Sequence, residues 1–192
     1  MSAGADPTGE LWVIRHGETE WSRDGRHTSR TDLDLTSAGE VVARQLAERL
    51  DGVEFDLVLT SPRLRARRTA ELAGQTTAEV DEDLTEWDYG DYEGITTPTI
   101  REDVPGWSVW THPSPGGESA DEVSERLDRV VDRVRSDGGR VLVFSHGHAS
   151  RALAARWLGL PVQDGQLFTL DTATVSVLAY DRGSPVVARW NS

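Results

Sequence analysis

Leu11-Trp12-Val13-Ile14-Arg15-His16-Gly17 is a short apolar run that ends abruptly in polar residues. Four consecutive apolar residues predict a strand that is buried on both faces, and the glycine predicts a loop directly after it. Residues 55–59, in which Asp56 is the one polar residue, and residues 140–144 are also largely apolar, and they end at Thr60-Ser61 and at Ser145-His146-Gly147. The sequence therefore predicts three buried strands, each followed by polar residues.

Helical patterns separate these strands. Ser37 and Glu40 have the spacing of a capping box, which predicts the start of a helix with Val42 on its buried face. Ser119 and Glu122 have the same spacing before a second apolar pattern. The expected helices cover residues 37–50, 62–73, 119–137 and 148–158, and two or three further short strands are expected near 166–170, 174–180 and 186–190.

Strands that alternate with helices predict an α/β fold of three layers, in which helices flank a mainly parallel central sheet. The length of 192 residues favours a single domain over residues 1–192. Residues 88–118 are irregular and rich in glycine, proline and tryptophan, and we expect them to form a cap or insertion. Ligands bind such sheets beyond the carboxyl ends of the strands, where the polar residues should meet.

Composition excludes several chemistries. All 20 basic residues are arginine and there is no cysteine, which excludes a Schiff-base lysine, a lysine-containing phosphate loop, a thiol nucleophile and thiolate metal sites. The net charge of −13 argues against a nucleic-acid partner. Residues 11–70, however, hold ten arginines against ten acidic residues. This neutral stretch is a candidate for local anion binding.

The chain carries no apolar run near the roughly 20 residues of a membrane-spanning helix. Residues 1–10 are small, polar and acidic, without the apolar core of a signal peptide. We therefore expect a cytoplasmic protein without a membrane partner.

Histidine–glycine pairs follow two of the expected strands, at His16-Gly17 and His146-Gly147, and Arg15 directly precedes the first pair. This combination indicates phosphoryl chemistry. A neutral imidazole nitrogen can attack phosphorus, and a guanidinium neutralises the phosphoryl oxygens. A carboxylic acid is then needed to protonate the leaving oxygen. One strand-end histidine alone more often belongs to a polar network, so the inference depends on the combination.

The sequence resembles the histidine phosphatase superfamily, also called phosphoglycerate mutase-like, through motifs in the family's order. They are Arg15-His16-Gly17-Glu18-Thr19-Glu20-Trp21-Ser22, Arg26-His27-Thr28-Ser29-Arg30-Thr31-Asp32-Leu33-Asp34-Leu35-Thr36, Thr60-Ser61-Pro62-Arg63-Leu64-Arg65-Ala66, Glu86-Trp87-Asp88-Tyr89-Gly90 and Ser145-His146-Gly147. The resemblance implies that His16 is the nucleophile and that Glu86 is the acid–base residue. It further implies that Arg15 and Arg65 clamp the phosphate and that His146 contacts it.

The resemblance also implies a set of substrate contacts: Gly17, Ser22, Thr28, Ser29, Tyr89, Gly147 and His148. Ser22 stands where the mutases commonly have asparagine, and Ser29 where glycine is common. We expect no metal and no cofactor, since the arginines supply the positive charge that magnesium would give. The expected partner is a small phosphorylated substrate, and the resemblance allows a homodimer. Glu18, Asp32 and Asp34 are expected to make structural hydrogen bonds.

The resemblance favours a phosphomonoester hydrolase over a mutase. Residues 91–115 are a short connection in which Arg101 and His112 are the only basic side chains, whereas the mutases carry a longer, more basic insertion. A closer likeness is to actinobacterial acid phosphatases and fungal sedoheptulose-bisphosphatase-like enzymes, through residues 86–95, Trp107-x-x-Trp110 and 116–119. A phosphoglycerate mutase and a non-catalytic phospho-ligand binding module stay open.

Three further points stay open at the level of sequence. Trp107, Trp110 and His112 could shape the substrate pocket, or the tryptophans could pin an irregular segment to the body through their large apolar area. His146-x-His148 has the spacing of a metal-ligand pair, although no further ligand stands nearby in the sequence. The part of the substrate beyond the phosphate is expected to be chosen by residues 88–118.

Overall fold

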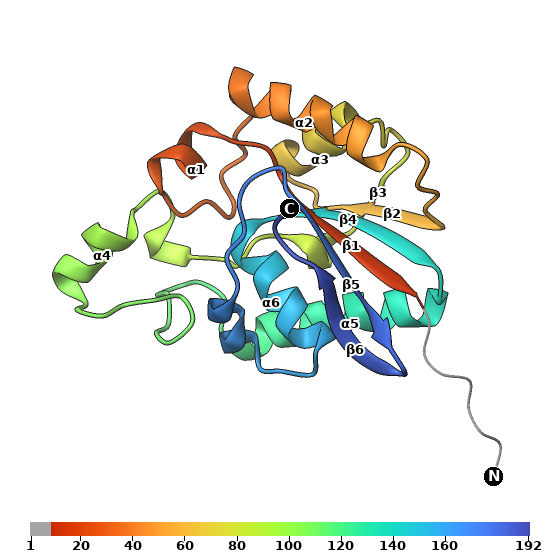
Figure 1. Cartoon of the computed structure of the whole chain (residues 1–192). Coiled ribbons are helices and arrows are strands. Elements are labelled where there is room, and N and C mark those ends of the chain that lie inside the picture. Colours follow the sequence, from red (N-terminus) through yellow and green to blue (C-terminus); the bar gives the residue numbers. More distant parts are fainter. Residues whose placement is uncertain (1–8) are drawn as a thin grey trace, which may run out of the picture.

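A computed structural model describes residues 9–192 (Figure 1). The strands are β1 (Glu10–Arg15), β2 (Leu57–Thr60), β3 (Glu79–Val80), β4 (Arg140–Ser145), β5 (Val175–Asp181) and β6 (Ser184–Arg189). The helices are α1 (Glu20–Asp24), α2 (Ser37–Leu50), α3 (Leu64–Leu72), α4 (Thr97–Asp103), α5 (Ala120–Asp137) and α6 (Gly147–Trp157), with the 3₁₀ helices η1 (Glu82–Leu84), η2 (Gly90–Tyr92) and η3 (Val162–Leu167).

The strands form one six-stranded sheet in the order β3-β2-β4-β1-β5-β6. β3, β2, β4 and β1 pair in parallel, and β5 and β6 add two antiparallel strands at the other edge. Helices α2 and α3 cover one face of the sheet and α5 and α6 the other (Figure 1). This arrangement confirms the predicted three-layer α/β fold with a mainly parallel sheet.

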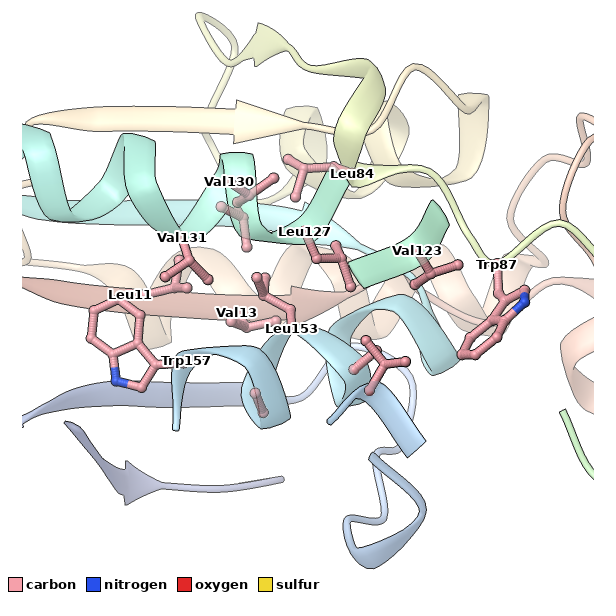
Figure 2. Packing of buried hydrophobic residues seen from close by; sticks show 14 of the residues in the cluster. Leu11, Val13, Leu84, Trp87, Val123, Leu127, Val130, Val131, Leu153 and Trp157 are labelled. Carbon is pink, nitrogen blue, oxygen red and sulfur yellow. The ribbon is translucent and has the colours of Figure 1, made fainter. Parts of the chain in front are cut away.

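Successive residues of the central strands enter two separate apolar clusters, because side chains of a strand alternate between the faces of the sheet. In β1, Leu11 and Val13 belong to the cluster under α5 and α6, whereas Ile14 belongs to the cluster under α2 and α3. Figure 2 shows the first cluster, where Leu127 and Leu153 pack beside β1. Full burial of one such side chain stabilises the fold by about 1.5–3 kcal/mol, so both helical layers are firmly attached.

The predicted start of α2 is wrong by one residue. Thr36, not Ser37, is the N-cap: its hydroxyl accepts from Gly39 N at 2.9 Å and donates to Glu18 Oε1 at 2.8 Å. Gly39 faces the backbone of Glu18 so closely that a Cβ would lie 2.3 Å from the Glu18 carbonyl oxygen. This contact fixes which side of α2 is buried, and Val42, predicted to be buried, is therefore 42% exposed.

The capping box of α5 is confirmed. Ser119 accepts from Glu122 N, and the Glu122 carboxylate accepts from Ser119 N at 2.8 Å. Gly138 ends the helix with a positive φ of 70°.

Of the two or three strands expected near the end of the sequence, those near 174–180 and 186–190 form as β5 and β6, whereas residues 166–170 include the end of η3 and form no strand. At Gly165 an added Cβ would lie 2.6 Å from the ring of Trp110, so the backbone of η3 packs directly on this ring. The helix α4 lies inside a segment expected to be irregular. Its N-cap Thr96 accepts from Thr99 N.

Helices α1 and α4 lie together beyond one end of the sheet, at the left of Figure 1. An isolated antiparallel bridge joins Arg26 to Thr96. His27 N donates to Ile95 O at 3.0 Å, and Gly94 N donates to His27 O at 2.8 Å. These bonds hold the segment after α1 against the segment before α4.

None of the helices in residues 9–192 has both the length and the apolar character needed to cross a membrane. The expectation about a signal peptide concerns residues 1–10, most of which lie outside the described residues.

Candidate active site

The polar residues that follow β1, β2 and β4 meet beyond the carboxyl ends of these parallel strands, as the strand pattern predicts. Hydrogen bonding continues beyond the ends of the strands: His16 N donates to Ser145 O at 3.0 Å, and Ser61 N donates to Phe144 O at 2.9 Å. The paired residues Arg15 and Ser145 end their strands at the same level. The fold therefore brings three segments that are distant in sequence to one place.

A cavity of about 240 Å³ opens at this edge. Its walls are formed by Arg15, His16, Ser22, Gly25, Arg26, His27, Thr28, Glu86, Tyr89, Thr97, Gly147, His148, Arg151 and Leu170. Among the predicted site residues, Gly17, Ser29, Arg65 and His146 do not line it. The wall carries mainly hydrogen-bonding and cationic side chains, which suits a polar, anionic ligand.

The imidazole of His16 has a defined tautomer. Its Nδ1 lies 2.7 Å from Gly17 O, and a carbonyl oxygen can only accept, so Nδ1 carries the proton. Burial, together with the positive charges of Arg65 and Arg15, holds the pKa of His16 well below its usual value. Nε2 therefore bears a free lone pair, as a nucleophile requires.

Arg15 lines the cavity beside His16. Its Nη1 donates to Leu170 O at 2.6 Å, while its buried Nε has no hydrogen-bond partner among the described residues. An unpartnered buried donor is costly unless a ligand satisfies it. The geometry thus leaves Arg15 with a donor available for a phosphoryl oxygen.

The Glu86 carboxylate caps the N-terminus of α6. Oε1 accepts from Trp87 N at 2.9 Å and from Ala149 N at 2.7 Å, and Oε2 accepts from His148 N at 3.1 Å. His146, the N-cap residue, has no side-chain capping bond of its own. Glu86 is buried yet lines the cavity, so the helix N-terminus fixes a carboxylate at the wall.

Arg65 and His146 support the site from behind the cavity wall. Arg65 Nε donates to His146 Nδ1 at 3.2 Å, so His146 carries its proton on Nε2 and donates to Ser61 Oγ at 2.7 Å. The rings of His146 and His16 are 5.2 Å apart in an edge-on arrangement. The phosphate contact expected of Arg65 and His146 stays a prediction, because these side chains here contact protein groups.

The guanidinium of Arg65 also organises the loop at 28–31. It is fully buried and donates to Thr31 O at 3.0 Å, Thr28 O at 3.0 Å and Ser29 O at 3.3 Å. Three carbonyl groups of one loop are satisfied by a single side chain. Its removal would leave these carbonyl groups, of which that of Ser29 is buried and the other two are partly buried, without this donor.

We expect Arg65→Ala to destabilise the fold by about 3 kcal/mol or more, because it removes the donor of several buried or partly buried acceptors. The free energy of unfolding from urea titration measures this. Arg67→Ala is the matched control, since Arg67 is exposed and should change stability by about 0.5 kcal/mol or less. Equal stabilities of the two variants would contradict this role of Arg65.

The predicted substrate-binding residues divide into two groups. Ser29 lies outside the cavity, and its hydroxyl donates to Glu93 at 2.5 Å. Gly17 is also outside, and its N–H donates to Thr69 Oγ1 at 2.9 Å. Ser22 and Thr28 line the cavity. The Ser22 hydroxyl also takes part in the capping box of α1, in which it donates to Thr19 O.

Tyr89, Gly147 and His148 form a connected part of the wall. The Tyr89 hydroxyl lies 2.6 Å from His148 Nδ1. Gly147 lies between two predicted catalytic groups, since an added Cβ would be 3.5 Å from both Arg15 and Glu86.

Trp107 and Trp110 are buried members of the larger apolar cluster and do not line the cavity. They support residues that do, because Trp107 packs edge-on against His27 at 5.2 Å and Trp110 against His148 at 5.1 Å. The tryptophans therefore pin the irregular segment to the body and shape the cavity indirectly. His112 lines a separate hollow.

Six cavity residues were not predicted from the sequence: Gly25, Arg26, His27, Thr97, Arg151 and Leu170. Arg151 follows Gly147 by four residues and His148 by three on α6, so a helical wheel of α6 could have suggested it. Arg26, His27 and Thr97 are brought together by the bridge and hydrogen bonds between two loops, and such contacts leave no periodic pattern in the sequence. His27 is packed against Tyr89 at 4.6 Å, and burial lowers its pKa to about 4.

Glu18, Asp32 and Asp34 make structural hydrogen bonds, as predicted. Glu18 accepts from Thr36 Oγ1, Asp32 accepts from Leu64 N at 2.7 Å, and Asp34 accepts from Leu35 N at 2.7 Å. None of these three acids lines the cavity of the candidate site.

Comparison with known proteins agrees with this geometry. The profile of the histidine phosphatase superfamily (branch 1) matches residues 11–192. An acid phosphatase of Mycobacterium tuberculosis is 45% identical over 177 residues, which cover 90% of this chain and 87% of that protein. A sedoheptulose 1,7-bisphosphatase of Saccharomyces cerevisiae is 37% identical over 185 residues, covering 79% of this chain and 68% of that protein.

A solved structure of an open reading frame product of Mycobacterium tuberculosis superposes with a TM-score of 0.90. The two chains are 44% identical, and the match covers 95% of this chain and 97% of the other. The chain therefore belongs to the histidine phosphatase superfamily, branch 1, and is a phosphatase of the acid phosphatase type.

Proposed function

We propose that this chain hydrolyses the phosphomonoester of a small, polar metabolite through a phosphohistidine on Nε2 of His16. The observation that carries this proposal is the state of that imidazole. Its Nδ1 proton is fixed on Gly17 O at 2.7 Å, its pKa is lowered, and it lines the cavity beside Arg15. A neutral, oriented nitrogen beside a cation is suited to attack an anionic phosphoryl group.

The reaction then has two halves. In the first, Nε2 of His16 attacks phosphorus in line, the bond from phosphorus to the leaving oxygen breaks, and protonated Glu86 gives its proton to that oxygen. In the second, water attacks the phosphohistidine, one water proton passes to Glu86, and the bond between nitrogen and phosphorus breaks. Phosphate leaves, and both side chains return to their starting states. Arg15 stabilises the phosphoryl oxygens in both halves.

The rest of the cavity favours a leaving group that carries a second anionic group. Arg151 lines the cavity, yet no described carboxylate lies within ion-pair distance of it. Its guanidinium is held in place by Gly165 O at 3.1 Å and by the ring of Trp110 at 4.7 Å. An unpaired arginine of this kind in a chain of charge −13 supports a substrate such as a sugar bisphosphate, the type that the name of the yeast relative indicates.

We expect Arg151→Gln to raise KM for a sugar bisphosphate about tenfold, because one charge-assisted contact contributes about 1.5–3 kcal/mol. KM for 4-nitrophenyl phosphate, which has no second anionic group, should change little. Steady-state kinetics with both substrates measure this. An equal rise in KM for the two substrates would show that Arg151 does not recognise the second anionic group of the leaving group.

A panel of phosphorylated metabolites tests the function as a whole. It includes sedoheptulose bisphosphate and 3-phosphoglycerate, the latter with and without 2,3-bisphosphoglycerate and each with and without a metal chelator. Release of free phosphate that depends on neither the bisphosphate cofactor nor a metal supports the proposal. Isomerisation of 3-phosphoglycerate would instead identify a mutase, and binding without turnover would identify a non-catalytic module.

A further inference from the structure

Two imidazoles other than that of His16 line the cavity, those of His27 and His148, and their ring centroids are 6.0 Å apart. They come from distant segments, since His27 lies in the loop after α1 and His148 in the first turn of α6. Burial lowers the pKa of His27 to about 4. Burial and the positive charge of Arg151 hold the pKa of His148 well below its usual value. Both rings are therefore uncharged at neutral pH, unlike the arginines of the same wall.

Each of these two rings is held by a protein hydroxyl through one of its nitrogens. Nε2 of His27 lies 3.1 Å from Thr97 Oγ1, and Nδ1 of His148 lies 2.6 Å from the hydroxyl of Tyr89. The other two nitrogens, Nδ1 of His27 and Nε2 of His148, have no hydrogen-bond partner among the described residues. Neither is one of the fully buried side-chain atoms that lack a partner. Both are therefore accessible to a ligand in the cavity that the rings line.

An accessible nitrogen of a neutral imidazole is suited to bind a hydroxyl group. It either donates or accepts one hydrogen bond, and a hydroxyl group can do both. The hydroxyls of Thr97 and Tyr89 can also donate or accept, so each ring can take the tautomer that a ligand hydroxyl requires. An anionic group is bound better by an arginine, which is charged and has only donors. His27 and His148 thus form a neutral surface for hydroxyl groups.

This neutral surface lies between two cationic parts of the wall. An added Cβ at Gly147 would be 3.5 Å from the side chain of Arg15. His148 is the next residue on α6, and Arg151 follows it by three residues, so that these two side chains share a face of the helix. A ligand that contacts Arg15 with its phosphoryl group and Arg151 with a second anionic group therefore passes the two imidazoles.

We propose that His27, held by Thr97, and His148 hydrogen-bond hydroxyl groups of the leaving group and thereby select the phosphate ester of a sugar or polyol. The inference deepens the proposed function and rests on it. His27 and His148 contact the substrate away from the reacting phosphorus and determine specificity. Thr97 is a positioning residue that acts through His27. An apolar leaving group would cover both free nitrogens without satisfying them, which lowers its affinity.

Two esters that differ only in their hydroxyl groups test this proposal in wild type. Sorbitol 6-phosphate and hexyl phosphate have the same number of carbon atoms and the same primary leaving oxygen. We expect kcat/KM for sorbitol 6-phosphate to exceed that for hexyl phosphate by about tenfold or more, the effect of two hydrogen bonds between neutral groups. Equal values of kcat/KM, or a preference for hexyl phosphate, would overturn the proposal.

Thr97→Val and His27→Phe test the assigned residues. Valine has the shape of threonine, and phenylalanine keeps a ring to pack on Tyr89, which lies 4.6 Å from the ring of His27. Each variant should lower kcat/KM for sorbitol 6-phosphate more than for hexyl phosphate, so that the ratio of the two values falls by about threefold to tenfold. A purely structural role would lower both values by the same factor, and that result would overturn the assignment.

Thr99→Val is the matched control for Thr97→Val. Thr99 is exposed on the same helix, α4, and does not line the cavity. Its ratio of kcat/KM for the two esters should equal that of wild type. A fall in this ratio as large as that of Thr97→Val would show that the preference does not depend on the contact between Thr97 and His27.

Binding measurements separate this inference from the proposed function. Calorimetry with His16→Ala protein gives the Kd of each ester without turnover, and sorbitol 6-phosphate should bind about tenfold more tightly than hexyl phosphate. If wild type forms no phosphohistidine, the proposed function fails, and the two Kd values still decide the inference. If wild type turns over both esters through phosphohistidine with equal kcat/KM, and the two Kd values are equal, only the inference fails.

Discussion

Replacing His16 by alanine is expected to lower kcat for 4-nitrophenyl phosphate by about 10⁴-fold or more, because loss of a nucleophile removes the covalent route. The imidazole is held between the Gly17 carbonyl and the ring of His146, which orients Nε2 as the attacking atom. Steady-state release of nitrophenol measures the effect.

His112→Ala is the matched control for this variant. Its imidazole lines a separate hollow and bonds to Thr111 at 2.9 Å, so we expect activity close to wild type. Wild-type hydrolysis by His16→Ala would exclude His16 as the nucleophile. Loss of activity in His112→Ala alone would move the reaction away from the described cavity.

Glu86→Gln is expected to have the second largest effect. The amide cannot give a proton to a leaving alkoxide, and general-acid catalysis contributes about 10²–10⁴-fold. We expect kcat for an alkyl phosphate to fall by about this factor, and kcat for 4-nitrophenyl phosphate to fall less. Comparison of the two rates in one preparation measures the effect.

Glu82→Gln serves as the control for Glu86→Gln, because Glu82 is exposed in η1 and does not line the cavity. Its rates should equal those of wild type. A fall of Glu86→Gln by the same factor on both substrates would contradict an acid role, and would indicate instead that the carboxylate matters only as the cap of α6.

The sequence predicts the fold well because β1, β2 and β4 each contain a short apolar run followed by polar residues. Burial on both faces leaves that pattern in the sequence, and adjacent parallel strands then bring His16, Ser61 and His146 to one edge. The start of α2 could not be placed to the residue. Thr36 and Ser37 are both competent caps, and the choice depends on a tertiary contact, the packing of Gly39 on Glu18.

The candidate site is predicted less completely. Motifs identify Arg65 and Ser29 but cannot show where their donors point, and in the structure these contact the 28–31 loop and Glu93. Arg151 carries no motif and is recognised only because η3 and Trp110 hold it at the cavity. Such roles depend on contacts between segments that are distant in the sequence, and these contacts leave no periodic pattern in a single sequence.

The distribution of charge has a physical explanation in the structure. Many exposed arginines are paired with acids, as Arg129 is with Asp83. Arg15, Arg65 and Arg151, which belong to the site, have no ion pair with any described acid. An acidic protein thus keeps a local positive field where the anionic substrate binds.

The most direct test of the central claim is to trap the intermediate. Wild-type protein is mixed rapidly with a phosphate ester that carries labelled phosphate, denatured in alkali, digested, and analysed by mass spectrometry for the labelled residue. We predict acid-labile, alkali-stable label on His16, and none in His16→Ala. Label on another residue, or full turnover by wild type with no labelled protein at any reaction time, would contradict the account.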